Sequence, residues 1–253
     1  MSKQARLRAQ ELRRVEQEAA AKRTRRRIVT TLGALVIVGL VVAIAVVIVR
    51  AAGSQRSLPE VTGEVVVPQH LTTNGSIPVG KAAAPVTVQI YYDYMCPACG
   101  AFEAANSSEL DRLVADGTAR VELHPIAFLD RLSSGTQYST RSAAAVAAVA
   151  DAAPDNVWAF HTALYQHQPA EGSEGLTDQQ IADVASGAGV PAAVVARFTD
   201  GSFQPWVAST TRKAFASGVE HTPTIKINGK VFDGDAFTVG PLTQAIESAA
   251  AGQ

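Results

Sequence analysis

The sequence predicts an α/β fold with a long helical insertion, preceded by a single N-terminal transmembrane helix. Three observations lead to this prediction. An apolar, charge-free stretch follows a basic N-terminal segment; runs of β-branched residues alternate with helical patterns; and the two cysteines of the chain form one Cys-x-x-Cys motif directly after such a run. We expect four segments: a cytoplasmic segment over 1–27, a transmembrane helix over 28–49, a linker over 50–60 and a folded domain over 61–253.

The charge of the chain is distributed unevenly. Residues 1–27 hold ten Lys and Arg against three Glu, a net charge of +7, so the remaining residues carry −8 of the overall −1. An anionic globular part lacks the basic surface that phosphate backbones require, which argues against nucleic-acid binding. The basic segment is typical of a topology determinant. A lipid-binding arm and a partner-binding helix are the alternatives.

Residues 28–49 form the predicted membrane span. The stretch carries no charge, and as a helix it would be about 33 Å long, enough to cross the lipid bilayer. The alternative is a cleavable signal peptide, whose apolar core usually has only about 7–15 residues, with cleavage near Ala51 or Ala52. Because basic residues favour the cytoplasmic side, we expect a single-pass cell-membrane protein whose domain beyond Arg50 lies outside the cytoplasm.

The first part of the domain shows strand patterns around one helix. Val61–Val67 predicts a short first strand, and residues 68–85 predict an irregular connection rich in turn residues. Val86–Tyr92 is a β-branched and aromatic run that suits a buried strand. The apolar spacing from Gly100 to Asp116 predicts a helix, and Val121–Ala127 predicts a second core strand.

The pattern then becomes helical over about 136–217, the predicted insertion. Helices are expected over Tyr138–Ala153, Val157–Gln168, Pro191–Phe198 and Gln204–Ala216. Thr177 and Gln180 form a capping box that starts a further helix. Beyond the insertion, Thr224–Ile227 and Lys230–Phe232 flank Asn228-Gly229, which predicts a hairpin, and Leu242–Ala250 predicts a terminal helix.

The cysteine pair is the most specific chemical signal. Cys96 is expected to cap the following helix, where free N–H groups and the helix dipole stabilise a thiolate and lower its pKa. Pro97 suits the first helical position. Cys99 follows almost one turn later, so it can attack a mixed disulfide at Cys96 and release the partner.

A metal site is the alternative for a Cys-x-x-Cys pair. Zinc needs about four ligands, and no second Cys or His pair follows at suitable spacing. Copper, held by two thiolates and a distant histidine, is the other option. We predict neither a metal nor a cofactor, and His124, His161 and His167 receive no function because no motif supports them.

Four features together resemble the DsbA-like branch of the thioredoxin superfamily, over roughly residues 60–251. They are a strand running into Asp93-Tyr94-Met95-Cys96-Pro97-Ala98-Cys99, the pair Phe102-Glu103 one turn on, the helical insertion, and Thr222-Pro223-Thr224 ahead of the hairpin. The resemblance implies a thioredoxin-like fold in which the bond before Pro223 is cis and lies against the active-site disulfide. It also implies that the backbone of Thr222 pairs with a bound substrate strand, and that the insertion overhangs the active site and binds unfolded polypeptide. The alternative for Pro223 is an ordinary trans proline of an edge strand.

The remaining candidates surround the cysteine pair. Glu103 lies four residues after Cys99 on one helical face, so it is either a proton relay or a solvated helix glutamate. In the family an acidic residue often stands six positions before the first cysteine, where this chain has Ile90. Ala98 replaces a histidine of several strong oxidases, which predicts a less oxidising pair. His221 is either a group that approaches the thiolate or a simple loop histidine. The expected substrate-binding residues are Pro97, Ala98, His221 and Thr222.

The resemblance implies a thiol–disulfide oxidoreductase, and we expect an oxidase. The oxidised pair would accept electrons from reduced secreted or cell-envelope proteins through a mixed disulfide at Cys96. A quinone-linked membrane partner, of the DsbB or vitamin K epoxide reductase type, would reoxidise it. The same residues serve a reductase or an isomerase, because the potentials set the direction. A non-catalytic binding or chaperone-like module is the rival from another class, and the intact cysteine pair argues against it.

Overall fold

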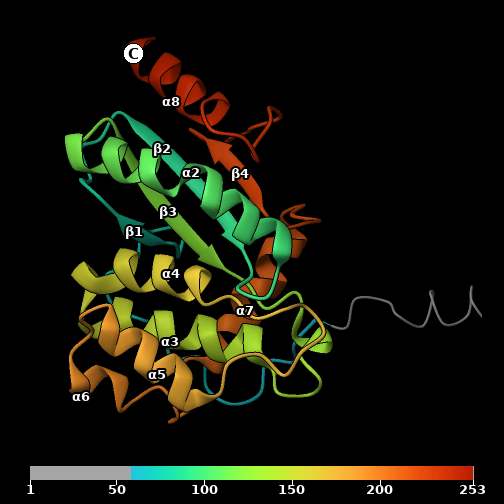
Figure 1. Cartoon of the computed structure of the whole chain (residues 1–253). Helices are drawn as coiled ribbons and strands as arrows, with labels where there is room; N and C mark the ends of the chain where they lie inside the picture. Colours follow the sequence, from blue (N-terminus) through green and yellow to red (C-terminus); the bar gives the residue numbers. More distant parts are fainter. Residues whose placement is uncertain (1–57, 253) are drawn as a thin grey trace, which may run out of the picture. The chain divides into compact units, whose positions relative to one another are not determined.

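The computed structural model describes residues 58–252, in which five strands form one mixed sheet (Figure 1). The strand order is β1-β3-β2-β4-β5. Central β2 pairs in parallel with β3 and antiparallel with β4, while β1 and β5 pair antiparallel at the two edges. The strands are β1 (Ile77–Val79), β2 (Val86–Tyr92), β3 (Ala119–Pro125), β4 (Thr224–Ile227) and β5 (Lys230–Val231).

Helices cover the sheet and form a separate layer beside it. They are α2 (Pro97–Asp116), α3 (Tyr138–Ala152), α4 (Val157–Gln166), α5 (Asp178–Gly187), α6 (Ala192–Val195), α7 (Gln204–Ala216) and α8 (Pro241–Ala251), with 3-10 turns η1 (Asp130–Leu132) and η2 (Pro154–Asn156). Helices α2 and α8 pack on the strands, α7 contacts β3, and α3 to α6 gather at one end of the sheet (Figure 1). Helices α3 to α7 occupy the range where the sequence predicts the insertion.

The predicted membrane span, 28–49, and the basic segment, 1–27, lie outside the described residues. Within 58–252, no helix is both long and apolar enough to cross a membrane. The localisation therefore stays a prediction from the N-terminal sequence.

The predicted first strand, Val61–Val67, was wrong. This run has no regular secondary structure, and its valines Val61, Val65, Val66 and Val67 are 38–60% exposed. The first strand is β1, inside the predicted irregular connection, where Ile77 pairs with Leu123 and is 1% exposed. The reason is physical: β-branched residues favour extended backbone, but a strand also needs a neighbour to pair with and a core to cover.

Local signals fixed several other elements. Burial alternates along β2, with Val86, Val88, Ile90 and Tyr92 buried, which confirms the core strand. Asn228 and Gly229 both have positive φ, 48° and 79°, as the tight turn of a hairpin requires. The capping box is also confirmed: Thr177 Oγ1 accepts from Gln180 N at 3.2 Å, and Gln180 Oε1 accepts from Thr177 N at 2.8 Å.

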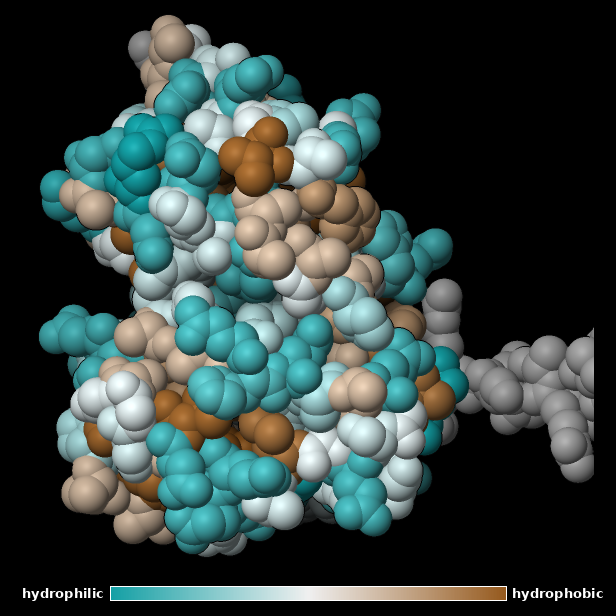
Figure 2. Space-filling model, in the orientation of Figure 1, coloured by the Kyte–Doolittle hydropathy of each residue, from teal (hydrophilic) through white to brown (hydrophobic). Residues whose placement is uncertain are grey.

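The helical layer has an apolar hollow. Figure 2 shows apolar side chains gathered over the part of the molecule that α3 to α5 build. A cavity of about 590 Å³ lies between α4 and α5 and is lined by Ala163, Leu176 and Val184 among others. The lining also includes Gln166, His167, Gln180 and Asp183, so the hollow presents polar groups beside its apolar side chains.

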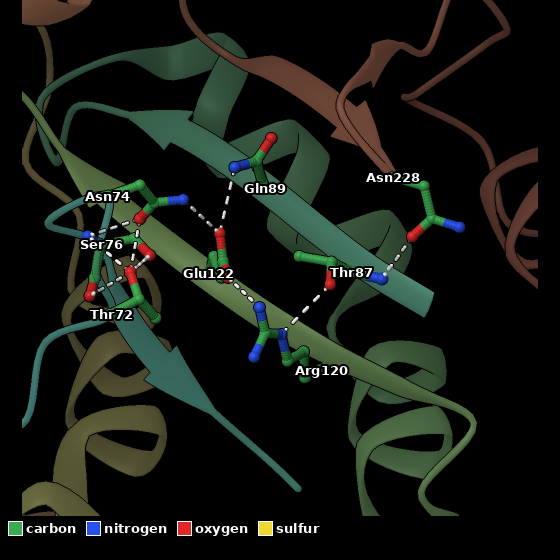
Figure 3. Close-up of polar contacts among 8 residues, drawn as sticks. All are labelled: Thr72, Asn74, Ser76, Thr87, Gln89, Arg120, Glu122 and Asn228. Carbon is green, nitrogen blue, oxygen red and sulfur yellow. Dashed lines mark hydrogen bonds and ion pairs between the residues drawn. The ribbon is translucent and has the colours of Figure 1, made fainter. Parts of the chain in front are cut away.

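A polar network centred on Glu122 joins β2 and β3 to the turn before β1 (Figure 3). This residue is 1% exposed, and its carboxylate accepts from Asn74 at 2.9 Å and Gln89 at 3.0 Å and pairs with Arg120 at 2.6 Å. Burial alone would raise the pKa of Glu122, but these three partners lower it. The network stabilises the pairing of the short edge strand β1.

Candidate active site

The cysteine pair lies where β2 leads into α2. Cys96 is the N-cap of α2 with extended backbone (φ −74°, ψ 115°), and Pro97 occupies the first turn, as the sequence predicts. Both thiols are free in this structure. Cys96 is 7% exposed and Cys99 is 1% exposed, so only Cys96 has an edge open to solvent.

Asp93 holds the loop that precedes Cys96. One carboxylate oxygen accepts from Met95 N at 2.8 Å and from the Ser139 hydroxyl at 2.7 Å. The other accepts from Phe128 N at 2.7 Å and Leu129 N at 2.8 Å. Burial raises the pKa of Asp93 to about 7 against the opposing effect of these donors. The loop is therefore fixed both to the segment after β3 and to α3.

The two thiols have opposite electrostatics. The pKa of Cys96 is lowered to about 6, first by the hydrogen bond from the Cys99 thiol, and further by Thr222 and the backbone N–H groups of Cys99 and Ala98, although burial acts the other way. Burial and the neighbouring Cys96 raise the pKa of Cys99 well above its usual value. At neutral pH Cys96 is thus mostly a thiolate and Cys99 a thiol, which is the division of a nucleophile and a resolving group.

The segment before β4 closes the site. The Thr222–Pro223 peptide bond is cis, so the alternative of an ordinary trans proline does not hold. The carbonyl oxygen of Thr222 lies 3.5 Å from Cys96 Sγ. Pro223 and Thr222 therefore lie directly beside the reactive sulfur.

The other predicted surface residues differ in their relation to the thiolate. Pro97 is exposed and Ala98 half-buried on the first turn of α2, beside Cys96. His221 is exposed, and its carbonyl oxygen accepts from Thr224 Oγ1 at 2.7 Å. Among the described residues no hydrogen bond joins the His221 imidazole to Cys96, which favours the simple loop histidine.

Glu103 is not the solvated helix glutamate that was one of the two alternatives. It is 5% exposed, and its Oε1 lies 3.0 Å from Nε2 of His161. His161, to which the sequence assigned no function, is 0% exposed and its Nδ1 lies 3.0 Å from the Tyr94 hydroxyl. The Tyr94 hydroxyl in turn lies 3.1 Å from that of Tyr92. The signal that points to His161 is its place on the buried stripe of α4, between Phe160 and Leu164.

Gln168 is a second residue that the sequence did not indicate. Its Nε2 donates to the carbonyl oxygens of Tyr94, at 3.1 Å, and Cys96, at 2.9 Å. Gly100 permits this approach, because a Cβ at that position would collide with the Gln168 amide. The insertion is thereby attached to the backbone of the cysteine motif.

Metal ligands are not assembled around the thiols. In the part of the chain that the structure describes, no group of three or more His, Cys, Asp or Glu is placed to hold a metal ion.

Comparisons with known proteins agree with this geometry. The family model described as thioredoxin matches residues 72–247, well over half of the chain. Serine/threonine-protein kinase PknE of Mycobacterium tuberculosis is 31% identical over 157 residues, which cover 60% of this chain and only 28% of the kinase. Disulfide bond formation protein D of Bacillus subtilis is 28% identical over 155 residues, covering 60% of this chain and 68% of that protein.

A solved structure extends the likeness to three dimensions. Oxidised DsbA of Mycobacterium tuberculosis has a TM-score of 0.57 and 28% identity, covering 70% of this chain and 98% of its own. The match to the family model, over residues 72–247, runs from before β1 into α8 and so includes the sheet, the cysteine loop and the inserted helices. The chain therefore belongs to the thioredoxin family, and its fold is that of the DsbA-like thiol–disulfide oxidoreductases.

Proposed function

We propose that this chain is a membrane-anchored, extracytoplasmic thiol oxidase that introduces disulfides into reduced secreted or cell-envelope proteins. One observation carries the proposal: a cysteine with a pKa of about 6 and a buried partner thiol lie together at a helix N-terminus, beside Pro223. Stabilising the Cys96 thiolate stabilises the reduced pair relative to the disulfide, which makes the disulfide a stronger oxidant.

Oxidation of a substrate proceeds by two thiolate attacks. A substrate thiolate attacks Cys96 Sγ of the oxidised pair, the Cys96–Cys99 bond breaks, and Cys99 leaves with the electron pair and takes up a proton. A second substrate thiolate then attacks the substrate sulfur of the mixed disulfide, and Cys96 leaves as a thiolate. The substrate loses two electrons and the pair gains them.

During reoxidation both cysteines act as attacking groups, Cys96 first and Cys99 second. The Cys96 thiolate attacks a disulfide of the partner, and a partner thiolate leaves. Cys99 then loses its proton, attacks Cys96 Sγ and expels the second partner sulfur. We propose that the partner is a quinone-linked membrane protein of the DsbB or vitamin K epoxide reductase type, and that Glu103 accepts the proton of Cys99.

The substrate surface surrounds Cys96. Pro97 and Ala98 flank the sulfur on one side, and the backbone of Thr222 supports pairing with an extended substrate strand on the other. The apolar hollow of the inserted helices (Figure 2) supports binding of an unfolded polypeptide. His221 is exposed and precedes Thr222 in the chain, which supports a contact with a bound substrate.

The N-terminal sequence supports the location. Residues 28–49 are charge-free and follow the basic segment 1–27, so we place the catalytic domain outside the cytoplasm. Protease added to intact spheroplasts should digest residues 58–252 and leave a small membrane-protected fragment. Protection of the whole chain would contradict this topology.

The redox state in cells tests the direction of the reaction. Acid quenching followed by a thiol-alkylating mass tag counts the free thiols of the native chain. For an oxidase we expect Cys96 and Cys99 to be mostly oxidised in cells. They should become reduced when the quinone-linked partner is removed. A mostly reduced pair would instead establish a reductase, the alternative that Ala98 favours because no histidine there stabilises the thiolate.

A second experiment distinguishes the thiol oxidase from a non-catalytic binding module. Replacing Cys96 by Ser should abolish disulfide exchange with insulin or a model peptide. Unchanged behaviour of Cys96→Ser in cells that need the protein would favour the binding module.

A further inference from the structure

A cavity of about 350 Å³ lies between α7 and one face of the sheet. Gln89 and Tyr91 stand two positions apart on β2, so their side chains point to the same face. Gln89 pairs with Lys226 of β4, Tyr91 pairs with His124 of β3, and all four residues line the cavity. The cysteine motif is not part of this lining, so the cavity is separate from the redox site.

The lining is positively charged, although the domain around it is anionic. Residues 28–253 carry a net charge of −8, yet Lys213 and Lys226, two of the four lysines beyond residue 57, line this one cavity. Among the described residues that line it, none is Asp or Glu. Within residues 58–252 neither lysine forms an ion pair with a carboxylate. Two uncompensated ammonium groups in one concave site attract an anion.

Glu122 shares this face of the sheet, but its charge is already balanced. Its carboxylate pairs with Arg120 at 2.6 Å and accepts one N–H each from Gln89 and Asn74 (Figure 3). A side-chain amide has two N–H bonds, so Gln89 and Asn74 each keep a second donor. Both amides line the cavity. They can therefore donate to a bound anion while Glu122 holds them in place.

Flat rings form another part of the lining. The rings of Tyr91 and His124 stack with centroids 4.2 Å apart and planes inclined by 13°. The ammonium group of Lys226 lies 5.2 Å from the centroid of the Tyr91 ring, and Trp206 of α7 also lines the cavity. Burial lowers the pKa of His124 to about 4 and raises the pKa of Tyr91, so neither ring is charged at neutral pH. Uncharged rings of this kind favour an aromatic partner.

We propose that this cavity binds a small aromatic carboxylate, with its carboxylate group between Lys213 and Lys226 and its ring against Tyr91 and His124. Sites for small molecules usually measure about 300–1,000 Å³, and this cavity lies at the lower end of that range, which suits an acid with one or two rings. This binding function is additional to thiol–disulfide exchange, because neither Cys96 nor Cys99 lines the cavity.

Three ligands of similar size test the proposal on the native protein. Saturation-transfer NMR follows each ligand titrated with the full-length protein in detergent, and empty micelles give the background. Benzoate should bind saturably. Benzamide, which has the ring without the charge, should bind roughly tenfold more weakly, because it loses the charged contacts to both lysines. Cyclohexanecarboxylate, which has the charge without the aromatic ring, should bind several-fold more weakly.

Substitutions in the lining locate the bound ligand. Lys213→Gln and Lys226→Gln should each raise the Kd of benzoate roughly tenfold and leave the weaker binding of benzamide unchanged. Lys230→Gln, which changes a lysine of β5 outside the lining, is the matched control. Tyr91→Leu should remove the preference for benzoate over cyclohexanecarboxylate. All the lysine variants should exchange disulfides with insulin at the native rate, which shows that they are folded.

Three results would overturn the proposal. They are no saturable binding of benzoate to the native protein, equal affinities of the native protein for benzoate and benzamide, and a double variant of Lys213→Gln and Lys226→Gln that binds benzoate as tightly as Lys230→Gln does. The first two need no substitution, so they decide the matter even where a variant does not fold. None of the three bears on the thiol oxidase, which insulin exchange tests separately.

Discussion

At the scale of single residues, the site separates two chemically identical thiols. Cys96 receives hydrogen bonds from Cys99, Thr222 and the free N–H groups of the first helical turn, whereas Cys99 points into the protein and faces a developing negative charge. Two cysteines only three positions apart therefore take different roles, Cys96 as the nucleophile and Cys99 as the resolving group. Since the N–H groups belong to α2 and Thr222 lies beside cis Pro223, the distinction depends on the loop geometry that Asp93 fixes.

The pH dependence of alkylation follows from this separation. In the reduced protein the reaction of Cys96 with iodoacetamide should titrate with a midpoint near pH 6, because its pKa is about 6. Cys99 should remain unreactive at neutral pH. Site-resolved mass spectrometry measures both. In Cys99→Ala the midpoint should rise, because alanine has no donor to replace the Cys99 thiol; a Cys96 midpoint near the ordinary value of 9.0 in the native chain would contradict the assignment.

The same shift predicts the pH dependence of stability of the reduced form. Because the folded-state pKa of Cys96 lies below its ordinary value, the stabilisation it contributes is fully present above pH 9 and is lost as the pH falls through about 6. The disulfide form has no thiol to titrate. The urea midpoint of the reduced protein should therefore rise relative to that of the oxidised protein as the pH rises from 6 to 9.

Titration of Asp93 should make the stability of the folded protein depend on pH in the opposite direction. Its folded-state pKa is raised from 3.8 to about 7, so the stabilisation it contributes is present below pH 3.8 and is lost as the pH rises through about 7. Asp93→Asn is expected to lower overall stability, because an amide cannot accept all four hydrogen bonds, and to remove this part of the pH slope. Urea unfolding at pH 5 and pH 8 measures the slope, with exposed Asp155→Asn as the control. An Asp93→Asn slope equal to that of the native chain would refute the role of Asp93.

At the scale of elements, local sequence decides some features and tertiary packing decides others. The strand-to-helix junction at Cys96, the Asn228-Gly229 turn and the Thr177 capping box depend on residues that are neighbours in the chain, and all three were predicted. The edge strand β1 depends on pairing with β3, more than forty residues away, and local β propensity wrongly favoured Val61–Val67 instead.

Some residues of the candidate site could likewise be predicted from local sequence, and others are brought together only by packing. The cysteines, Pro223 and Thr222 were predicted from motifs. The partnership of Glu103 with His161 joins residues 58 positions apart on two helices, and that of Cys96 with Gln168 spans 72. Spacing within one helix cannot reveal such pairs, because only the packing of the insertion against α2 creates them.

The corrected position of the first strand has a measurable consequence. Ile77→Ala should lower the free energy of unfolding by about 2–4 kcal/mol, because it leaves a cavity beside β3. Val66→Ala should change the free energy of unfolding by less than about 0.5 kcal/mol, because this side chain is exposed and belongs to no strand. Urea denaturation of the two variants compares them directly. Equal losses would contradict the exposed position of Val66.

At the scale of the whole domain, the inserted helices are part of the active site. Helix α3 contributes Ser139 to Asp93, α4 contributes His161 to Glu103, and the segment after α4 contributes Gln168 to the carbonyl groups of the cysteine loop. On the opposite side, cis Pro223 and β4 close the site. The cysteine motif is therefore held between the sheet and the insertion, which explains how a short loop keeps two sulfurs in unlike environments.

Trapping of a mixed disulfide tests the division of labour between the two cysteines most directly. Reduced Cys99→Ser, incubated with insulin, should accumulate a stable mixed disulfide, because the Cys96 thiolate attacks and nothing resolves the product. Cys96→Ser should accumulate none, since the pKa of the Cys99 thiol is raised and that thiol is buried. Mass spectrometry of the trapped species should place insulin on residue 96. Equal trapping by both variants, or insulin on residue 99, would contradict the account.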